Sequence, residues 1–357
     1  MKPWLVPVGG FLGSGKSSLL LAAGQRLRAR GVKVAILTND QAAGLVDTVT
    51  ARNQEFDAGE VAGACFCCAF TKFIDAAAEL AARGAEVILA EPVGSCTDIA
   101  ATVLGPLHQD FGHLFRLAPF TVLVDPAQYG LLHTPEADQE VAWLHGRQIA
   151  EADILAFSKC DLGEPLPELH APALRLSARS GTGVDAWLEE VLSGRTAPGT
   201  HLLADLDYGR YARAEALLAW LNASVVLRTN KPTSPAELLG PLVDELDQRL
   251  TRSGVSIAHL KTWIESAHAW LRVSMTRNWQ EPAVEGDRLA APAREYRLVV
   301  NLRALGEPDE LQACVEQALA ALPAIANIER IDCFRPLPPQ PERRVGRTDD
   351  RHASSVA

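Results

Sequence analysis

Several features that mark particular classes of protein are missing from this sequence. Its 357 residues contain no run long and apolar enough to span a bilayer, and Met1-Lys2-Pro3-Trp4 lacks the apolar core of a signal peptide. Basic residues are not in excess, since 34 Lys and Arg stand against 44 Asp and Glu, for a formal charge of −10. A nucleic-acid footprint needs a basic patch. We therefore expect no nucleic-acid partner, no membrane partner and a cytoplasmic location.

Internal repeats and histidine-rich runs are also absent from the sequence. A histidine-rich run of the kind used for metal storage is therefore not part of this chain. With 357 residues, of which 48% are hydrophobic, the chain is long enough for two domains and apolar enough for a large core.

The clearest motif is Gly10-Phe11-Leu12-Gly13-Ser14-Gly15-Lys16-Ser17, a complete phosphate-binding loop. An apolar strand precedes it at Trp4–Val8 and a helix follows from Ser17, which is the context that this motif requires. Its glycines let backbone N–H groups turn toward a phosphate, while Lys16 would reach the β- and γ-phosphates and Ser17 would ligate Mg²⁺. The alternative is a glycine-rich turn without a ligand. The expected nucleotide contacts are Gly10, Gly13, Ser14, Gly15, Lys16, Ser17 and Ser18.

Two further strands end in polar residues at the edge of the sheet where ligands bind in α/β proteins. The strand at 32–37 is followed by Thr38-Asn39-Asp40-Gln41, where Asp40 is either a turn residue or a neighbour of Mg²⁺. The strand at 86–90 is followed by Glu91-Pro92-Val93-Gly94. Glu91 would serve Mg²⁺ or the attacking water, and the Gly94 N–H would sense the γ-phosphate.

The segment Ser158-Lys159-Cys160-Asp161 follows a later strand and indicates guanine recognition. The Asp161 carboxylate can accept hydrogen bonds from both N1–H and the exocyclic amine of guanine, a donor pair that adenine lacks. The Lys159 stem would lie along the base. Backbone N–H groups of Ser177 and Ala178 would meet the guanine O6.

Three of the seven cysteines, Cys65, Cys67 and Cys68, lie within four residues. In a reducing compartment such a cluster favours metal or redox chemistry over a structural disulfide framework. Cys65 and Cys67 would share one face of an extended segment, and a bend is expected to bring Cys68 round to them. Thiolates at this spacing suit Zn²⁺ or a similar ion, with a fourth position left open. Cys96 is either a small buried residue or the fourth ligand. A redox Cys65–Cys67 disulfide and simple core packing remain as alternatives.

The order of elements predicts two domains. Residues 1–195 are expected to form an α/β P-loop NTPase domain with a mostly parallel sheet, in which 41–64 is a loop region with a short strand. A linker at 196–222 leads to a smaller α+β domain of split-βαβ type at 223–334, and 335–357 is expected to be a disordered tail. A polar loop is expected at 276–294. We assign no ligand role to His259, Trp263, His268 and Trp270.

These motifs together resemble the CobW-like metallochaperone GTPases, which are kin of the UreG and HypB maturation GTPases. The resemblance covers residues 1–195 well, and it departs from many relatives at Ala62-Gly63-Ala64-Cys65 and at Asp40-Gln41-Ala42-Ala43-Gly44. It implies a GTPase that uses Lys16 and Glu91, is slow, and is stimulated by metal or a partner. It also implies that Cys65, Cys67 and Cys68 hold Zn²⁺ or Co²⁺ for a client metalloprotein or cofactor-synthesis enzyme.

Two other functions stay open at this stage. One is a passive metal-buffering or redox-sensing module in which the nucleotide only stabilises the fold. The other is a P-loop small-molecule kinase, against which Asp161 and the cysteine cluster argue. The sequence identifies neither the cellular metal nor the client, and it leaves open whether the protein is a homodimer.

Overall fold

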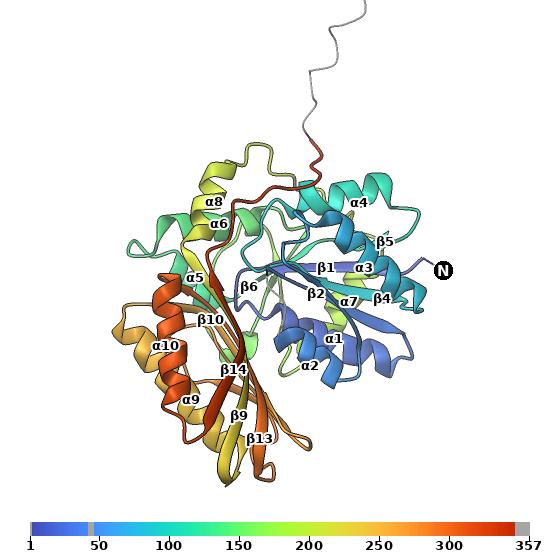
Figure 1. Ribbon diagram of the computed structural model, residues 1–357. Coiled ribbons are helices and arrows are strands. Elements are labelled where there is room, and N and C mark those ends of the chain that lie inside the picture. The colour runs from blue at the N-terminus through green and yellow to red at the C-terminus, as the bar shows by residue number, and fades with distance from the viewer. Residues whose placement is uncertain (1, 42–45, 347–357) are drawn as a thin grey trace, which may run out of the picture.

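Two sheets, each with its own helices, form the protein in a computed structural model that describes residues 2–41 and 46–346 (Figure 1). Residues 42–45 of the expected loop region and 347–357 of the expected tail lie outside the described residues, as does Met1.

The first sheet is parallel and contains eight strands within the described residues. Seven of them follow the order β3-β2-β4-β1-β6-β7-β8, and the short β5 pairs with β1. Their bounds are β1 Trp4–Gly10, β2 Val34–Asp40, β3 Asp57–Ala62, β4 Val87–Glu91, β5 Arg116–Leu117, β6 Thr121–Val124, β7 Ile154–Phe157 and β8 Ala173–Arg175.

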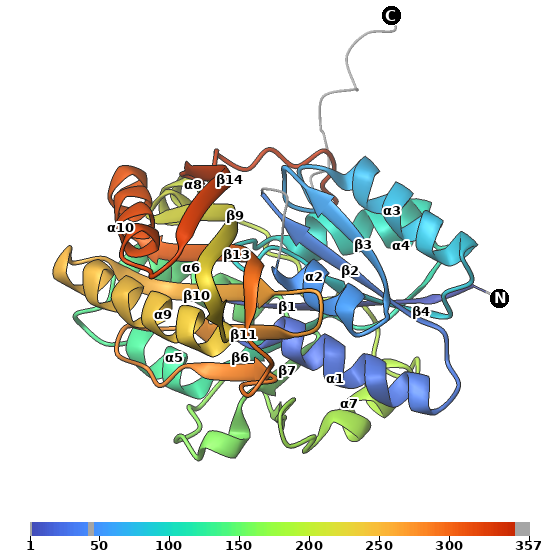
Figure 2. The same cartoon turned by 60° about the horizontal axis from the view of Figure 1, so that its bottom comes forward.

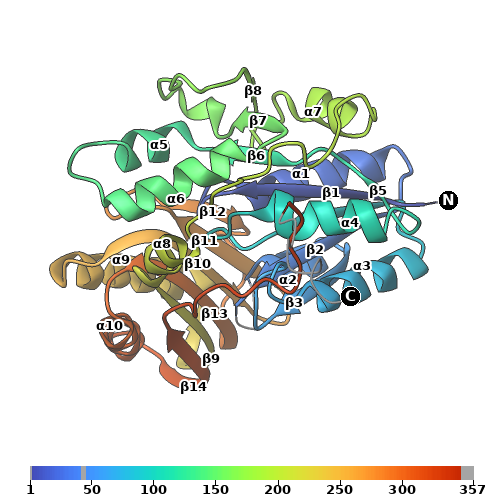
Figure 3. The same ribbon diagram turned by 90° about the horizontal axis from the view of Figure 1, so that it is seen from above.

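Helices cover both faces of this sheet, which is why its central strands are apolar throughout (Figure 3). Val6 and Val8 of β1 pack with α1 and α7, whereas Leu5 packs on the opposite face with α3 and α6. The helices of this part of the chain are α1 Lys16–Ala29, α2 Val46–Asn53, α3 Phe70–Ala82, α4 Gly105–Asp110, α5 Pro126–Leu132, α6 Gln139–Ala150 and α7 Val184–Val191, with a π-helical turn η1 at Ala100–Leu104 and a 3₁₀ turn η2 at Cys160–Leu162.

This architecture confirms the predicted α/β P-loop fold with a parallel sheet. In the described part of 41–64, the expected short strand is present as β3, but the expected loop before it is wrong because helix α2 lies there. The helix has little apolar periodicity, and tertiary contacts hold it instead. The backbone N–H of Val46, its first residue, donates to Asn301 Oδ1 of the second domain at 2.8 Å.

The second sheet is antiparallel, in the order β12-β11-β10-β13-β9-β14. Without the β11–β12 extension, its four remaining strands and two helices follow the β-α-β-β-α-β order of a split βαβ fold, as predicted. The expected polar loop at 276–294 contains the short strand β12. The bounds are β9 Leu218–Thr233, α9 Pro235–Arg252, β10 Ser256–Glu265, β11 Trp270–Met275, β12 Ala283–Gly286, β13 Ala293–Leu305, α10 Pro308–Ala320 and β14 Ile325–Phe334.

One face of the second sheet is covered by α9 and α10, and the other faces the first domain (Figure 2). Side chains alternate between the two faces of a strand. In β13, Val300 and Leu302 belong to the apolar core under the helices, while Asn301 and Arg303 bond to residues of the first domain. The sheet therefore presents polar side chains to the phosphate-binding side of its neighbour.

The connections between and beyond the two sheets are more ordered than expected. The expected linker at 196–222 contains helix α8, Tyr208–Ala216, and the first residues of β9. Residues 335–346, expected to be disordered, lie along the first domain (Figure 1), where Val345 N donates to Ala101 O at 2.9 Å. Among the described residues, none of the helices has the length and apolar character that crossing a bilayer requires.

Candidate functional site

The phosphate-binding loop curls between β1 and α1 through three glycines with positive φ. Gly10, Gly13 and Gly15 have φ of 129°, 76° and 94°, a region that other residues rarely adopt. Lys16 Nζ donates to the carbonyls of Gly10, at 2.8 Å, and Phe11, at 3.1 Å, so the ammonium lies inside the curl. Burial lowers the pKa of Lys16 to about 8. This geometry can hold a phosphate chain against backbone N–H groups and one cation.

Gly94, the expected γ-phosphate sensor, lies directly against the phosphate-binding loop. A Cβ atom at this position would come within 2.9 Å of Leu12 Cδ2 and 3.0 Å of Lys16 Nζ. A side chain here would displace the ends of the Leu12 and Lys16 side chains and crowd the Leu12 backbone nitrogen, 3.1 Å away.

The expected Mg²⁺ ligands meet at the start of α1. Ser17 Oγ donates to Glu91 Oε1 at 3.1 Å, and Glu91 Oε2 is buried without a hydrogen-bond partner among the described residues. Burial, followed by the nearby Asp47 carboxylate, raises the pKa of Glu91. A hydroxyl and a carboxylate oxygen without a partner are the hard donors that Mg²⁺ prefers, so these residues fit the ion.

The expected guanine-binding residues lie at the ends of β7 and β8. Lys159 has φ of 54°, and its ammonium forms an ion pair with Asp125 Oδ2 at 2.7 Å. Asp161, in η2, is exposed and free to meet a base. The Ser177 N–H was expected to meet the guanine O6, but it donates to Thr182 O at 3.0 Å instead. Ala178 therefore remains as the expected backbone donor.

The three clustered cysteines form a compact set of thiols between β3 and α3. Their sulfur atoms lie within 4.8 Å of one another, and no other group of three or more candidate ligands is this close in the described part of the chain. Cys65 and Cys67 are buried with sulfurs 2.9 Å apart, and a turn closed by Cys68 N and Cys65 O, at 3.0 Å, brings the third thiol round. This is the bend that the sequence predicts. Soft sulfur donors at this spacing can hold a thiophilic ion.

Cys96 approaches this cluster from the loop that follows Gly94. Hydrogen bonds with Cys67, Cys68 and Cys96 lower the pKa of Cys65, while burial raises the pKa of Cys96. Gln148 Nε2 donates to the carbonyls of both Gly94 and Cys96 at 2.9 Å. Gly94, the expected phosphate sensor, and Cys96 are therefore both held by the Gln148 side chain of α6.

Asn39 joins the end of β2 to the cysteine loop. Its amide nitrogen donates to Ala64 O at 2.8 Å, and its amide oxygen accepts from Phe66 N at 2.7 Å. These bonds fix the backbone on both sides of Cys65. A displacement of the polar end of β2 would thus be transmitted to the thiols.

The segment 335–346 covers the cluster from outside. Gln340 N donates to Cys68 Sγ at 3.1 Å, and Glu342 N donates to Cys67 O at 2.9 Å. The Glu342 carboxylate also accepts from the N–H and hydroxyl of Thr71 at the start of α3. This contact could not be predicted from the sequence, because a proline- and charge-rich stretch has no hydrophobic periodicity.

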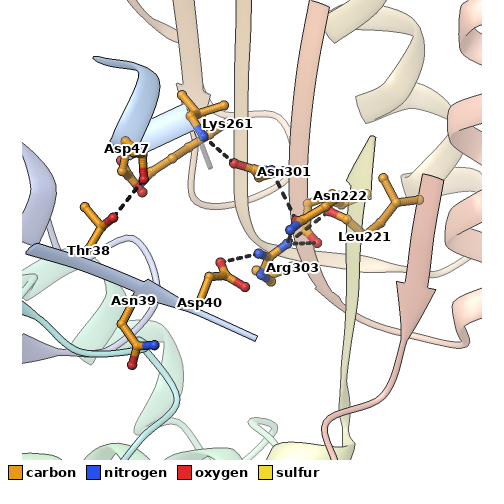
Figure 4. A network of polar contacts seen from close by, with 12 residues as sticks. Thr38, Asn39, Asp40, Asp47, Leu221, Asn222, Lys261, Asn301 and Arg303 are labelled. Atoms are coloured by element: carbon orange, nitrogen blue, oxygen red, sulfur yellow. Dashed lines mark hydrogen bonds and ion pairs between the residues drawn. The ribbon is translucent and has the colours of Figure 1, made fainter. Parts of the chain in front are cut away.

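The second domain supplies residues of the site that sequence reasoning missed. Arg303 forms an ion pair with Asp40 at 2.6 Å, which gives Asp40 an interdomain role (Figure 4). In the sequence, the only pattern that could have indicated these second-domain residues is the polar side chains at alternate positions of the predicted strands. Residues from the second domain that line the same pocket as Lys16 and Glu91 are Trp220, His259, Lys261, Asn301 and Arg303.

Glu151, which directly follows α6, makes the stability of the folded protein depend on pH. It accepts from Thr97 Oγ1 at 2.8 Å and Ala100 N at 3.1 Å, and burial raises its pKa to about 8 from 4.5. The folded protein thus keeps a proton that the unfolded chain loses, so this contribution to stability is full below pH 4.5 and is lost as the pH rises to about 8.

Replacing Glu151 with glutamine should flatten that dependence, because an amide does not titrate. In denaturant unfolding, the fall in unfolding free energy between about pH 5 and about pH 9 should shrink by roughly 2–4 kcal/mol. Glutamine also loses one acceptor, so some stability is lost at every pH. The exposed Glu189→Gln is the control, and an unchanged pH slope in Glu151→Gln would contradict the assignment.

Comparison with known proteins gives one domain match and several distant structural likenesses. The profile of the CobW/HypB/UreG nucleotide-binding domain matches residues 5–177. No curated protein has a significant match to the chain. Nickel-bound HypB from Helicobacter pylori is 15% identical, with a TM-score of 0.41, over 55% of this chain and 90% of its own. Zn(II)-bound YjiA GTPase from E. coli is 13% identical, with a TM-score of 0.32, over 89% and 99%. Both TM-scores are below 0.5, so a family assignment rests on the domain match.

Proposed function

Because residues 5–177 match the CobW/HypB/UreG nucleotide-binding domain, we propose that the protein is a GTPase in which the bound nucleotide controls the binding of a metal ion to the clustered thiols. The observation that carries this proposal is the shared loop that joins the two sites. Gly94 touches the phosphate-binding loop, and Cys96, two residues on, neighbours the clustered thiols. A shift of this loop with the γ-phosphate would change the geometry of the metal ligands.

In the proposed hydrolysis of GTP, each residue of the nucleotide site has a separate role. Lys16 binds and neutralises the β- and γ-phosphates, Asp161 selects guanine, and Glu91 orients the attacking water or the Mg²⁺ shell. Ser17 and Glu91 would hold Mg²⁺, which supplies positive charge to the phosphate oxygens. Intrinsic hydrolysis by P-loop switches without a supplied arginine is on the order of 10⁻⁴ to 10⁻² per second. Turnover is therefore slow until metal or a partner stimulates it.

The cargo is proposed to be Zn²⁺ or Co²⁺, held by Cys65, Cys67 and Cys68 and passed to a client metalloprotein or cofactor-synthesis enzyme. Thiolate donors suit these ions better than Mg²⁺ or Ca²⁺. A reducing cytoplasm would keep the thiols free, as they are in the structure.

Single-turnover hydrolysis of GTP with and without Zn²⁺ tests this function. The wild type should hydrolyse GTP slowly and faster with Zn²⁺, while Cys67→Ser should keep the slow rate and lose the stimulation. Equal rates with and without Zn²⁺ would favour a passive metal-buffering or redox module. Transfer of the γ-phosphate to a small molecule rather than to water would favour a kinase.

Cys96→Ser tests whether the fourth thiol is a ligand. If it is, the affinity for Zn²⁺ should fall by roughly tenfold or more, because a hydroxyl is a poorer donor than a thiolate. The measurement is competition with a chromophoric zinc chelator under reducing conditions. An unchanged affinity for Zn²⁺ would show that Cys96 is a buried core residue and not a metal ligand.

A further inference from the structure

A lysine of the second domain donates hydrogen bonds to oxygen atoms of the first domain that could also bind Mg²⁺. Lys261 Nζ, from β10, donates to Ser17 Oγ at 3.0 Å and to both carboxylate oxygens of Asp47 at 2.7 and 2.6 Å. The Lys261 and Asp47 side chains are only 10% and 14% exposed, and Figure 4 shows them facing each other between the domains. This is a buried, charge-assisted contact rather than a surface ion pair.

The same Ser17 hydroxyl is the expected Mg²⁺ ligand, and it bonds to Glu91 as well. Mg²⁺ binds oxygen at about 2.0–2.1 Å and demands a near-octahedral shell. An ammonium group within hydrogen-bond distance of the same hydroxyl takes up that space. The two cations also repel each other strongly at the low effective dielectric of a buried site. Lys261 in this position and Mg²⁺ on Ser17 therefore exclude each other.

Neighbouring contacts tie the lysine to the packing of the two domains. Val46 N, one residue before Asp47, donates to Asn301 Oδ1, and Asp40 pairs with Arg303, with both partners on β13 beside β10. Thr276 of the second domain also packs against Gly13, where a Cβ would come within 2.4 Å of its Cγ2. The Lys261 contact is thus one of several between the second domain and the first, and it is the one that joins β10 to α2.

We propose that Lys261 competes with Mg²⁺ for Ser17 and Asp47, so that binding of Mg²⁺ with the nucleotide releases the contact between β10 and α2. The second domain is then the element whose packing reports nucleotide state. The proposal rests on the nucleotide site of the proposed function, but it does not depend on hydrolysis or on the cysteine cluster.

The first test is the Mg²⁺ dependence of binding of a fluorescent GDP derivative to the full-length protein. In Lys261→Met, the Mg²⁺ concentration at half-maximal nucleotide affinity should fall by roughly tenfold or more, because a charge-assisted bond no longer opposes the ion. Lys261→Arg keeps the competing charge and should stay close to wild type. Lys231→Met, an exposed lysine of the same domain, is the matched control and should leave the midpoint unchanged.

The second test uses thermal unfolding with Mg²⁺ alone. Lys261→Met leaves Asp47 and Glu91 without their nearest interdomain cation, so it should melt below wild type and recover when Mg²⁺ is added. Wild type should respond little to Mg²⁺. Lys261→Gln, which keeps a polar head group, is a second neutral variant in case the methionine variant folds only with Mg²⁺, an outcome that also supports competition.

The outcomes separate this proposal from the proposed function. If the wild type binds no guanine nucleotide at any Mg²⁺ concentration, the proposed GTPase function is wrong. Nucleotide binding with the same Mg²⁺ midpoint in wild type, Lys261→Met and Lys261→Gln would overturn the competition alone. So would a loss of stability in both neutral variants that Mg²⁺ does not restore.

Discussion

Cys67→Ser should lower the affinity of the protein for Zn²⁺ by about 100-fold or more. Thiolate sites bind zinc with apparent free energies of about 10–16 kcal/mol, shared among a few ligands, so losing one removes on the order of 3 kcal/mol. Cys67 is the middle thiol of the cluster, with its sulfur 2.9 Å from Cys65 and 3.7 Å from Cys68. Competition with a chromophoric chelator under reducing conditions measures the loss.

Cys333→Ser is the control for that measurement. Cys333 is a half-buried thiol of β14 that packs against the core of the second domain and donates to Pro308 O at 3.1 Å, a bond that serine can keep. Its substitution should leave zinc affinity unchanged. Equal affinities for wild type and Cys67→Ser would show that the cluster is not the metal site.

Asp161→Asn should lower the affinity for GTP by at least about 100-fold. The carboxylate accepts two hydrogen bonds from guanine, whereas the asparagine side chain would place its own NH₂ donor against one of the two guanine donors. The same change should improve binding of xanthosine triphosphate, whose base carries a carbonyl where guanine has its exocyclic amine. Asp161 is exposed in η2, so the substitution should not disturb the fold. Fluorescent-nucleotide competition with GTP, xanthosine triphosphate and ATP measures all three affinities.

Glu164→Gln provides the matched control, since Glu164 is an exposed acid three residues beyond Asp161. It should leave all three nucleotide affinities as in wild type. If Asp161→Asn bound GTP as tightly as wild type, the guanine assignment at this strand end would be wrong, and ATP would become the nucleotide to examine.

The parts of the fold that follow from local chemistry could be read from the sequence. Glycine and lysine spacing at 10–17, apolar strands such as β4 and the bend that brings Cys68 to Cys65 each depend on a few adjacent residues. The split βαβ order of the second domain likewise follows from strand and helix periods. These features need no knowledge of distant partners.

The parts that were missed depend on contacts between distant residues. Helix α2 has a weak apolar period and is held by Asn301 and Lys261, more than 200 positions along the chain. The segment 335–346 has no period of its own and is ordered by bonds to Cys68, Thr71 and Ala101. Lys261 itself occupies an alternate position of an ordinary strand, so nothing local marks it as part of the nucleotide site.

The central claim is that nucleotide state changes metal affinity, and one titration tests it directly. Zn²⁺ affinity is measured by chelator competition with the protein saturated first with a non-hydrolysable GTP analogue and then with GDP, both with Mg²⁺. Coupling between two sites is typically 5- to 150-fold, so the two affinities should differ by at least about fivefold. Because a nucleotide that is indifferent to the metal-bound state shifts nothing, equal affinities in the two complexes would contradict the claim.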